Sequence, residues 1–409
     1  MTFRTYDPTT DRPAVHRILR EVGWLEKGKE EVLDASIESA RAMVADLNGE
    51  PECIVTTAPG TMRYLDEELP LVEVTMVATS HIARRQGLAK RLLARALADD
   101  VADGSIVARV CAFDQGFYDN VGFGMGGYEH TLSFDPATLK VNVRPRLPRR
   151  LGADDLKLIH ASRLARRRGH GGMNYASDAI TAVELGYHLD NHFGLGYCDG
   201  PNGELTHHFY GRGSGERGPY YLHWLAFQTT EQFLELMGLI KSLADQVRLV
   251  RLREPAGIHL QDLLDRPFKH QEITERSKFE NRISSYAFWQ VRICDLAACL
   301  AHTHLPWGAV RFNLHLTDPA AGLLDEDAAW RGIGGEYVVT LGGQSSCEPG
   351  TDPSLPTLTA SVSAFSRLWL GVRPATGIAA TDQLSGPPSL LDELDRVLRL
   401  PQPRPDWDF

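Results

Sequence analysis

The feature that most constrains this chain is a predicted strand that leads through a glycine-containing turn into an amphipathic helix. The strand is the β-rich run VTMVAT at residues 74–79, and the turn is RRQGLA at residues 84–89. Apolar residues then recur at helical spacing from Leu88 to Val101. A helix that starts this way exposes unpaired N–H groups at the positive end of its dipole, where phosphates bind. We therefore expect a mixed α/β fold with an anion-binding loop at this turn.

Each residue type in the turn suits a bound diphosphate. Gly87 lets the backbone approach the anion closely, and Ala89 is small for the same purpose. Arg84 and Arg85 add positive charge and planar donor groups. The amides near Leu88 are the free donors of the first helical turn. The alternative is an ordinary basic helix start after a strand, because the pattern R-x-x-G-x-A alone is only moderately specific.

A second motif follows about thirty residues later. Residues 105–112 (SIVARVCA) predict a buried strand, and FYDNVGF at 117–123 places Tyr118 before Gly122 and Phe123. Taken alone, Tyr118 could be a half-buried aromatic residue and Gly122 a turn residue. The third motif is the chain end, Trp407-Asp408-Phe409, which follows Pro401, Pro403 and Pro405 in a stiff, extended tail.

With these motifs together, the chain resembles the Eis (enhanced intracellular survival) family of GCN5-related N-acetyltransferases (GNATs). The resemblance implies an α/β (α+β) fold with two tandem GNAT-fold domains and a sterol-carrier-protein-2-like domain. The catalytic domain that binds acetyl-CoA would span residues 1–141. A second, degenerate GNAT-like domain would span 152–287, where no second R-x-x-G-x-A occurs. The sterol-carrier-like domain would span 288–409 and end in a tail that enters the active site.

The resemblance also implies roles for individual residues. Tyr118 would be the general acid for the CoA thiolate, and the α-carboxylate of Phe409 the general base. Asp408 would face a cationic substrate, and Trp24 would form a wall of the substrate site. The remaining predicted residues would bind the cofactor, through strand backbone or through the phosphate loop: Val77, Thr79, Arg84, Arg85, Gly87, Leu88 and Ala89. At Thr79 the family more often has an apolar residue, which matters little if only its backbone is used.

The implied activity is acetyl transfer from acetyl-CoA, the only cosubstrate expected, to a primary amine by direct attack. The amine would belong to a polycationic small molecule such as an aminoglycoside or polyamine. A protein or peptide lysine acetyltransferase and a non-catalytic acyl-CoA or lipid carrier remain alternatives. The family resemblance further implies a homo-oligomer, a hexamer.

Composition limits other readings of the chain. A formal net charge of −10 argues against a general nucleic-acid binder and suits a cationic substrate. The start has no signal-peptide core and no run is long and apolar enough for a membrane helix, so we expect a cytoplasmic protein without a membrane partner. The six cysteines show no zinc spacing, and His207 and His208 would point to opposite faces of a strand, so no metal is expected.

Several expectations concern single elements. A helix is predicted over residues 32–45, a hairpin over 52–65 with its turn at Pro59, and a strand over 128–133 that closes the first domain. Residues 143–151 (VRPRLPRRL) predict a solvated linker. Asn202-Gly203 predicts a hairpin, and a helix over 230–244 would be capped by Thr229 or Thr230. A further helix is expected from Phe288.

Overall fold

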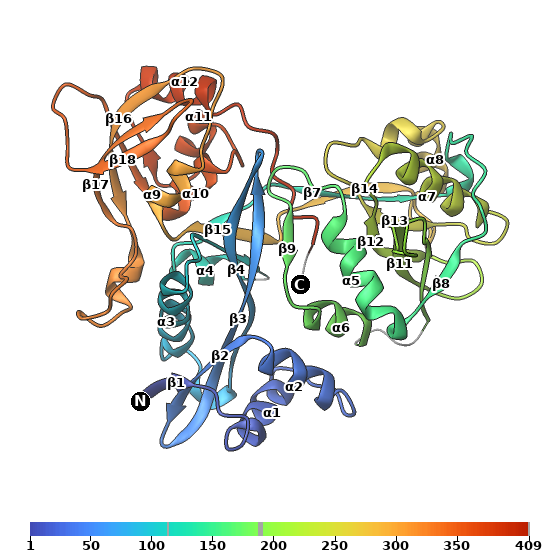
Figure 1. The fold of residues 1–409 in the computed structure, drawn as a ribbon, viewed down its shortest axis with the longest axis horizontal. Helices are drawn as coiled ribbons and strands as arrows, with labels where there is room; N and C mark the ends of the chain where they lie inside the picture. The colour runs from blue at the N-terminus through green and yellow to red at the C-terminus, as the bar shows by residue number, and fades with distance from the viewer. Residues whose placement is uncertain (113, 187–190, 408–409) are drawn as a thin grey trace. The chain divides into compact units, whose positions relative to one another are not determined.

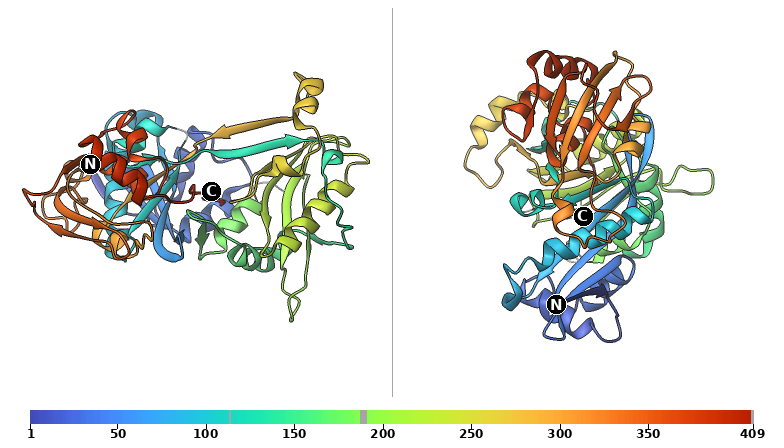
Figure 2. Two further views of the ribbon diagram at one scale, coloured as in Figure 1. Left: turned by 90° about the horizontal axis from the view of Figure 1, so that it is seen from above. Right: turned by 90° about the vertical axis from the view of Figure 1, so that its left-hand side faces the viewer.

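The computed structural model describes residues 1–112, 114–186 and 191–407. The chain divides into two compact units, which can be followed by colour in Figures 1 and 2. The first unit combines Met1–Gly127, His170–Ala176 and Ala287–Phe409, and the second combines Tyr128–Gly169 and Ser177–Tyr286. Within the described ranges, every helix is too short or too polar to cross a membrane.

The first unit contains an eight-stranded sheet with the order β1-β2-β3-β4-β5-β15-β6, and β9 pairs with β3. Strands β4 and β5 are parallel, so the chain between them crosses over through a helix, α3. The strands are β1 (Thr2–Thr5), β2 (Arg41–Leu47), β3 (Glu50–Tyr64), β4 (Glu67–Thr79), β5 (Val107–Cys111), β6 (Gly124–Met125), β9 (Met173–Tyr175) and β15 (Trp289–Ile293).

Helices cover both faces of this sheet because its strands alternate between two apolar cores. Met43 and Val55 pack with α3 (Leu88–Ala102) on one face. Val44 and Ile54 pack on the other face with α1 (Arg12–Glu21) and α2 (Glu30–Glu38). Figure 1 shows α3 and the α1–α2 pair on opposite sides of β2–β4. A short helix, α4 (Gln115–Asp119), follows β5.

The same unit holds a five-stranded sheet with the order β18-β17-β16-β19-β20. Its strands are β16 (Val310–Thr317), β17 (Gly335–Leu341), β18 (Ser346–Pro349), β19 (Thr357–Ser361) and β20 (Leu384–Ser385). The helices with it are α9 (Leu296–Ala301), α10 (Val362–Trp369), α11 (Ala375–Ala379) and α12 (Pro388–Val397). Its core continues into the first sheet, where the Tyr64 ring stacks on Trp369 with centroids 4.5 Å apart. The sterol-carrier likeness of this part stays a prediction.

The second unit is a seven-stranded sheet with the order β14-β7-β13-β12-β11-β10-β8. Its strands are β7 (Glu129–Phe134), β8 (Arg149–Leu151), β10 (His192–Tyr197), β11 (His207–Gly213), β12 (Tyr220–Ala226), β13 (Val250–Arg253) and β14 (Arg282–Tyr286). Its helices are α5 (Leu156–Ala165), α6 (Ala179–Gly186), α7 (Thr230–Ser242) and α8 (Pro267–Thr274). Because β12 and β13 are parallel and joined through α7, this unit repeats the crossover of β4, α3 and β5. The predicted mixed α/β class is confirmed, with a parallel crossover through a helix in each of the two units.

Two strands differ from the sequence prediction: β7 lies in a different sheet, and β15 occupies the place of a predicted helix. The strand expected at 128–133 exists as β7, but it pairs with β13 and β14 in the second unit and does not close the first domain. The helix expected from Phe288 is wrong at its start, because Trp289–Ile293 is strand β15 and the helix α9 begins at Leu296. The residues of β15 alternate between apolar Trp289, Val291 and Ile293 and polar Gln290 and Arg292, a period-2 pattern that fits a strand, although all five side chains are buried.

Two further expectations fail locally. The helix predicted over 32–45 ends at Glu38, and Arg41–Leu47 is strand β2. The predicted 52–65 hairpin is instead one long strand, β3. Pro59 is tolerated inside it because the β2 pairing has already ended at Arg41↔Thr57, so the missing N–H removes no bond on that side.

The division into domains at 1–141, 152–287 and 288–409 stays a prediction. The contacts group the chain differently, with residues up to 127 and from 287 onward in one unit.

Candidate active site

The turn before α3 leaves the start of that helix uncapped by any side chain of its own. Gly87 occupies the N-cap position with φ +76°, a left-handed conformation that favours glycine, and Arg85 also has a positive φ of 61°. The first bond of the helix runs from the Arg91 N–H to the Gly87 carbonyl at 3.3 Å. The amides of Leu88 and Ala89 precede it and are therefore available to an anion. No acidic residue stands in the first turn of α3.

Strand β4 presents its backbone beside this helix start. Its parallel pairing with β5 ends at Val74↔Val110, and an irregularity in the register with β3 lies between Thr56 and Thr57, opposite Thr75. Beyond this point β4 continues to Thr79 without a strand partner on the β5 side within the described pairings. The Thr79 hydroxyl donates to Cys53 Sγ at 3.3 Å, so its side chain already has a partner on β3.

Tyr118 lies on α4, and polar contacts hold this short helix at both ends. Asp114 caps it by accepting from the Phe117 N–H at 3.3 Å. Gln115 Nε2 donates to the Ala287 carbonyl at 2.7 Å, and Gln290 Nε2 donates to Asp119 Oδ1 at 2.6 Å. Sequence reasoning missed these partners because they come from the chain around β15, and local patterns carry no signal of such a contact.

Burial controls the protonation of Tyr118. Its side chain is buried and packs edge-on against the rings of Phe117 and Phe123. Burial raises the pKa of the Tyr118 phenol above its usual value near 10, and the negative charge of Glu73 raises it further. The phenol therefore stays protonated at neutral and mildly alkaline pH and is able to donate a proton.

One open cavity of about 720 Å³ joins these parts. That volume lies in the range of sites that bind nucleotide-sized ligands. The structure brings into its lining all the predicted site residues that it describes: Trp24, Val77, Thr79, Arg84, Arg85, Gly87, Leu88, Ala89 and Tyr118. Lining residues that the sequence did not single out are Val22, Ala83, Lys90, Asp114, Phe117 and Asn120. Trp24 is 38% exposed, as befits a wall near the mouth of a site.

The C-terminal tail packs into the first unit up to its last described residue. The Trp407 side chain is buried and meets the Tyr175 ring edge-on, with centroids 5.2 Å apart. The Pro405 carbonyl accepts from the Met173 N–H at 3.1 Å, and the Arg404 N–H donates to the His170 carbonyl at 2.8 Å. Asp408 and Phe409, the predicted substrate contact and base, lie outside the described residues.

Sequence reasoning also missed a buried ion pair. Arg109 Nη1 lies 2.9 Å from Glu73 Oε1, and both side chains are almost completely buried. A signal was present in the sequence, because each charged residue interrupts an otherwise apolar strand run. A charge in such a position is rarely left unpaired.

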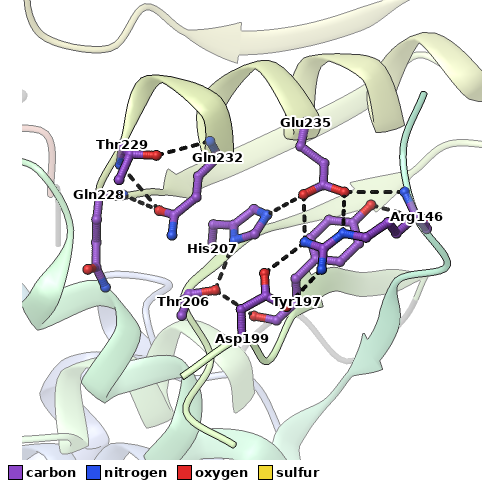
Figure 3. A network of polar contacts seen from close by, with 9 residues as sticks. All are labelled: Arg146, Tyr197, Asp199, Thr206, His207, Gln228, Thr229, Gln232 and Glu235. Carbon is purple, nitrogen blue, oxygen red and sulfur yellow. Dashed lines mark hydrogen bonds and ion pairs between the residues drawn. The ribbon is translucent and has the colours of Figure 1, made fainter. Parts of the chain in front are cut away.

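The second unit contains the one group in the described chain with metal-ligand spacing, formed by Asp199, His207 and Glu235 (Figure 3). Arg146 donates to both carboxylates, at 2.7 Å to Asp199 Oδ2 and 2.7 Å to Glu235 Oε2. The Arg146 guanidinium therefore already occupies the oxygens of Asp199 and Glu235 that a metal ion would need. Arg146 also shows that the predicted linker 143–151 is anchored to the second unit and ends in strand β8.

The two neighbouring histidines of β11 point to opposite faces, as predicted. His207 lies 3.2 Å from Glu235 Oε2, whereas His208 contacts Ser162 and Trp224 on the other face.

Comparison with known proteins agrees with this geometry. The family described as "Acetyltransferase (GNAT) domain" matches residues 9–126. No curated protein matches the chain in sequence. A probable N-acyltransferase from Enterococcus faecalis V583 has a similar structure, with a TM-score of 0.80 at 16% identity, covering 100% of this chain and 99% of that one.

Two other solved structures are similar over their whole length. A GCN5-related N-acetyltransferase from Anabaena variabilis has a TM-score of 0.78 at 13% identity, with 100% of both chains covered. Eis1 from Mycobacterium abscessus has a TM-score of 0.76 at 16% identity, again with 100% of both chains covered. At such identities the likeness establishes the fold. The matched domain leads to the conclusion that this chain carries a GNAT acetyltransferase domain over residues 9–126, in agreement with the enzyme class, N-acetyltransferase, that its sequence predicted.

Proposed function

We propose that this protein transfers the acetyl group of acetyl-CoA to a primary amine of a polycationic small molecule, of the aminoglycoside or polyamine type. The cavity beside α3 carries the proposal, because it combines an open helix start, a free strand edge and a protonated phenol in one space. Each of these features serves a different part of acetyl-CoA.

The helix start would bind the pyrophosphate. The free amides of Leu88 and Ala89 donate to its oxygens, and Arg84 and Arg85 supply charge. Gly87 permits the close approach of the backbone. The β4 edge at Val77 and Thr79 would then hold the pantetheine arm as an added strand would be held, and an N–H near Val77 would polarise the acetyl carbonyl.

The chemistry is a direct attack with two proton transfers. The amine nitrogen forms the new C–N bond while the C–S bond of the thioester breaks. Tyr118 gives its proton to the departing sulfur, and the α-carboxylate of Phe409 takes the proton that the amine loses. Holding the reactants in one cavity supplies much of the rate. The packing of the tail up to Trp407 supports a role for the chain end.

The substrate class is supported by charge and by likeness. The chain has a formal net charge of −10, which attracts cations. Asp408 would bind a further ammonium group of the substrate, and Trp24 would form one wall. Eis1 from Mycobacterium abscessus shares the full-length fold. A lysine side chain of a protein is the competing acceptor, and non-catalytic carriage of an acyl-CoA or lipid is the competing function.

The test is amine-dependent release of CoA, measured by thiol titration with aminoglycosides, polyamines and lysine peptides. Three proteins are compared: the native chain, a chain lacking Phe409, and a chain extended by one glycine that displaces the terminal carboxylate. We expect release with polycationic amines in the native chain and a loss of about 100-fold in both variants, with unchanged acetyl-CoA binding. Release with lysine peptides alone would identify the protein acetyltransferase. Acetyl-CoA binding without release for any amine would favour the carrier.

A further inference from the structure

The buried pair of Glu73 and Arg109 lies at the centre of the first sheet. The two residues are direct partners in the parallel β4–β5 ladder, and each follows or precedes apolar, buried residues such as Val74 and Val110. Their side chains are 0% and 1% exposed. Taking two charges out of water is costly, and well-packed apolar residues often serve stability as well or better. A buried pair in this position therefore suggests a role besides stability.

Arg109 connects the pair to the C-terminal tail. Its Nη1 atom, besides bonding Glu73, donates to the Tyr175 hydroxyl at 3.3 Å and to the Trp407 carbonyl at 3.4 Å. Tyr175 and Trp407 also contact each other through their rings. The Arg109 guanidinium thus forms hydrogen bonds to strand β4, strand β9 and the tail, three segments that are far apart in the sequence.

Glu73 connects the pair to the candidate acid. Its negative charge acts on the phenol of Tyr118, next to burial itself, in raising the pKa of that group. Glu73 thus acts electrostatically on Tyr118, while its partner Arg109 bonds the last described residue of the tail. A displacement of Arg109 would remove the hydrogen bond that its guanidinium donates to the tail at the Trp407 carbonyl.

We propose that Arg109, oriented by Glu73, is a positioning residue that fixes the C-terminal tail at the Trp407 carbonyl beside the site of acetyl transfer. The effect on catalysis rests on the proposed function, whereas the effect on the tail does not. Arg109 acts on the reaction through the tail.

The first test measures the tail directly, by hydrogen exchange and mass spectrometry of peptides covering residues 399–409. We expect Arg109→Met to raise exchange in these peptides, and Arg109→Lys, which keeps the charge but loses the planar fork, to raise it less. Arg292→Met is the matched control, because Arg292 forms an equally buried pair with Asp318 in the same unit. Unchanged tail exchange in folded Arg109→Met, or the same rise in Arg292→Met, would overturn the proposal. This readout holds whether or not the protein proves to be an acetyltransferase.

The second test separates positioning from general damage. Trp407→Ala should loosen the tail without touching the ion pair, and both it and Arg109→Met should lower kcat by about 100-fold with little change in the KM for acetyl-CoA. In a chain that ends at Asp406, Arg109→Met should add no further loss, because its target is gone. An additional loss of the same size in the truncated chain would show that Arg109 acts by another route and would overturn the proposal. Trp407→Ala also keeps the test informative if Arg109→Met does not fold.

Discussion

Helices α3 and α7 occupy the same topological position, since each crosses over between two parallel strands, but their N-termini differ. At α3 the N-cap is Gly87, which has no side chain, and Arg84, Arg85 and Lys90 line the cavity beside it. At α7 the N-cap is Thr229, whose side chain accepts from the Gln232 N–H at 3.3 Å while Gln232 Oε1 accepts from the Thr229 N–H at 3.3 Å. Figure 3 shows this reciprocal cap.

Beyond the cap, the Glu235 side chain of α7 also has partners within the second unit. Glu235 receives hydrogen bonds from Arg146 and contacts His207, and Arg146 also lies over the Tyr197 ring. The two units therefore share the crossover but differ in whether a side chain caps the crossover helix. At α7 the Thr229 side chain accepts from the Gln232 N–H, whereas at α3 the N-cap residue is glycine and no side chain caps the first turn.

The largest expected effect, on acetyl-CoA binding, comes from placing a side chain at the uncapped N-terminus of α3. Gly87→Asp places a carboxylate where the pyrophosphate would bind and gives α3 a side-chain cap; Asp tolerates the left-handed conformation better than most residues. We expect acetyl-CoA binding, measured by calorimetry, to weaken by about 100-fold or more, with the fold retained. Gly203→Asp is the control, because Gly203 has a similar φ of +82° and open space around it in the second unit. Unimpaired binding in Gly87→Asp would remove the helix start from the site.

The next effect concerns Tyr118, the proposed acid, which lines the cavity beside α3. Tyr118→Phe should lower kcat by about 100-fold while the affinity for acetyl-CoA stays within about twofold. The pKa of Tyr118 is raised, so its protonated form persists to higher pH than for an ordinary tyrosine. The pH profile of kcat should accordingly show no fall near pH ~10 from this group. A kcat that is unchanged in Tyr118→Phe would exclude the phenol from the chemistry.

A smaller effect, on stability, is expected from the ion pair between Arg146 and Glu235 in the second unit. The hydrogen bond with Arg146 lowers the pKa of Glu235 from its ordinary 4.5 to about 2. A depressed carboxyl pKa stabilises the fold above the ordinary pKa, and this stabilisation is lost as pH falls from 4.5 toward 2. Since Arg146 is 56% exposed, solvent screening reduces the effect, and Arg146→Met should cost about 1–2 kcal/mol at pH 7. Chemical unfolding of the native protein and of Arg146→Met at pH 7 and pH 3 measures this cost. The difference in the free energy of unfolding between the two proteins should be smaller at pH 3.

Arg146→Met should leave acetyl-CoA affinity unchanged, because Arg146 belongs to the second unit. Weakened cofactor binding in this variant would contradict the contrast between the two units.

The smallest effect is loss of the α7 cap. Thr229→Ala removes one of the two reciprocal bonds and should lower the free energy of unfolding by about 1 kcal/mol. Thr229→Gly should lower it less, because glycine is itself an acceptable N-cap. Thermal or urea unfolding measures both. If Thr229→Gly also creates measurable binding of a phosphate anion at α7, the cap residue alone separates the two helices.

The sequence predicted the parts of the fold and site that depend on neighbouring residues. The turn at Gly87, helix α3 and the Thr229 cap follow from local propensity and capping chemistry. The association of Tyr118 with the predicted phosphate loop rests on the resemblance of the two motifs, in order and spacing, to the acetyltransferase family. These features needed no knowledge of distant contacts.

The rest depends on pairing between segments far apart in the chain. The sequence wrongly predicts a helix at strand β15 because the neighbours of β15 in the sheet, β5 and β6, precede it by more than a hundred and sixty residues. The contacts of Gln290 with Asp119, and of Arg109 with Trp407, were invisible for the same reason. Local patterns set which segments are apolar, but only the folded sheet decides which partner each segment meets.

The late position of β15 has a consequence for how the protein is made. During synthesis, strand β5 leaves the ribosome long before β15, so the first sheet keeps an unpaired apolar edge until residue 293 has emerged. Unpaired edges of this kind are sites of aggregation. The nascent chain would therefore benefit from a chaperone during that interval, and a fragment ending at residue 127 would lack a strand that its own sheet requires.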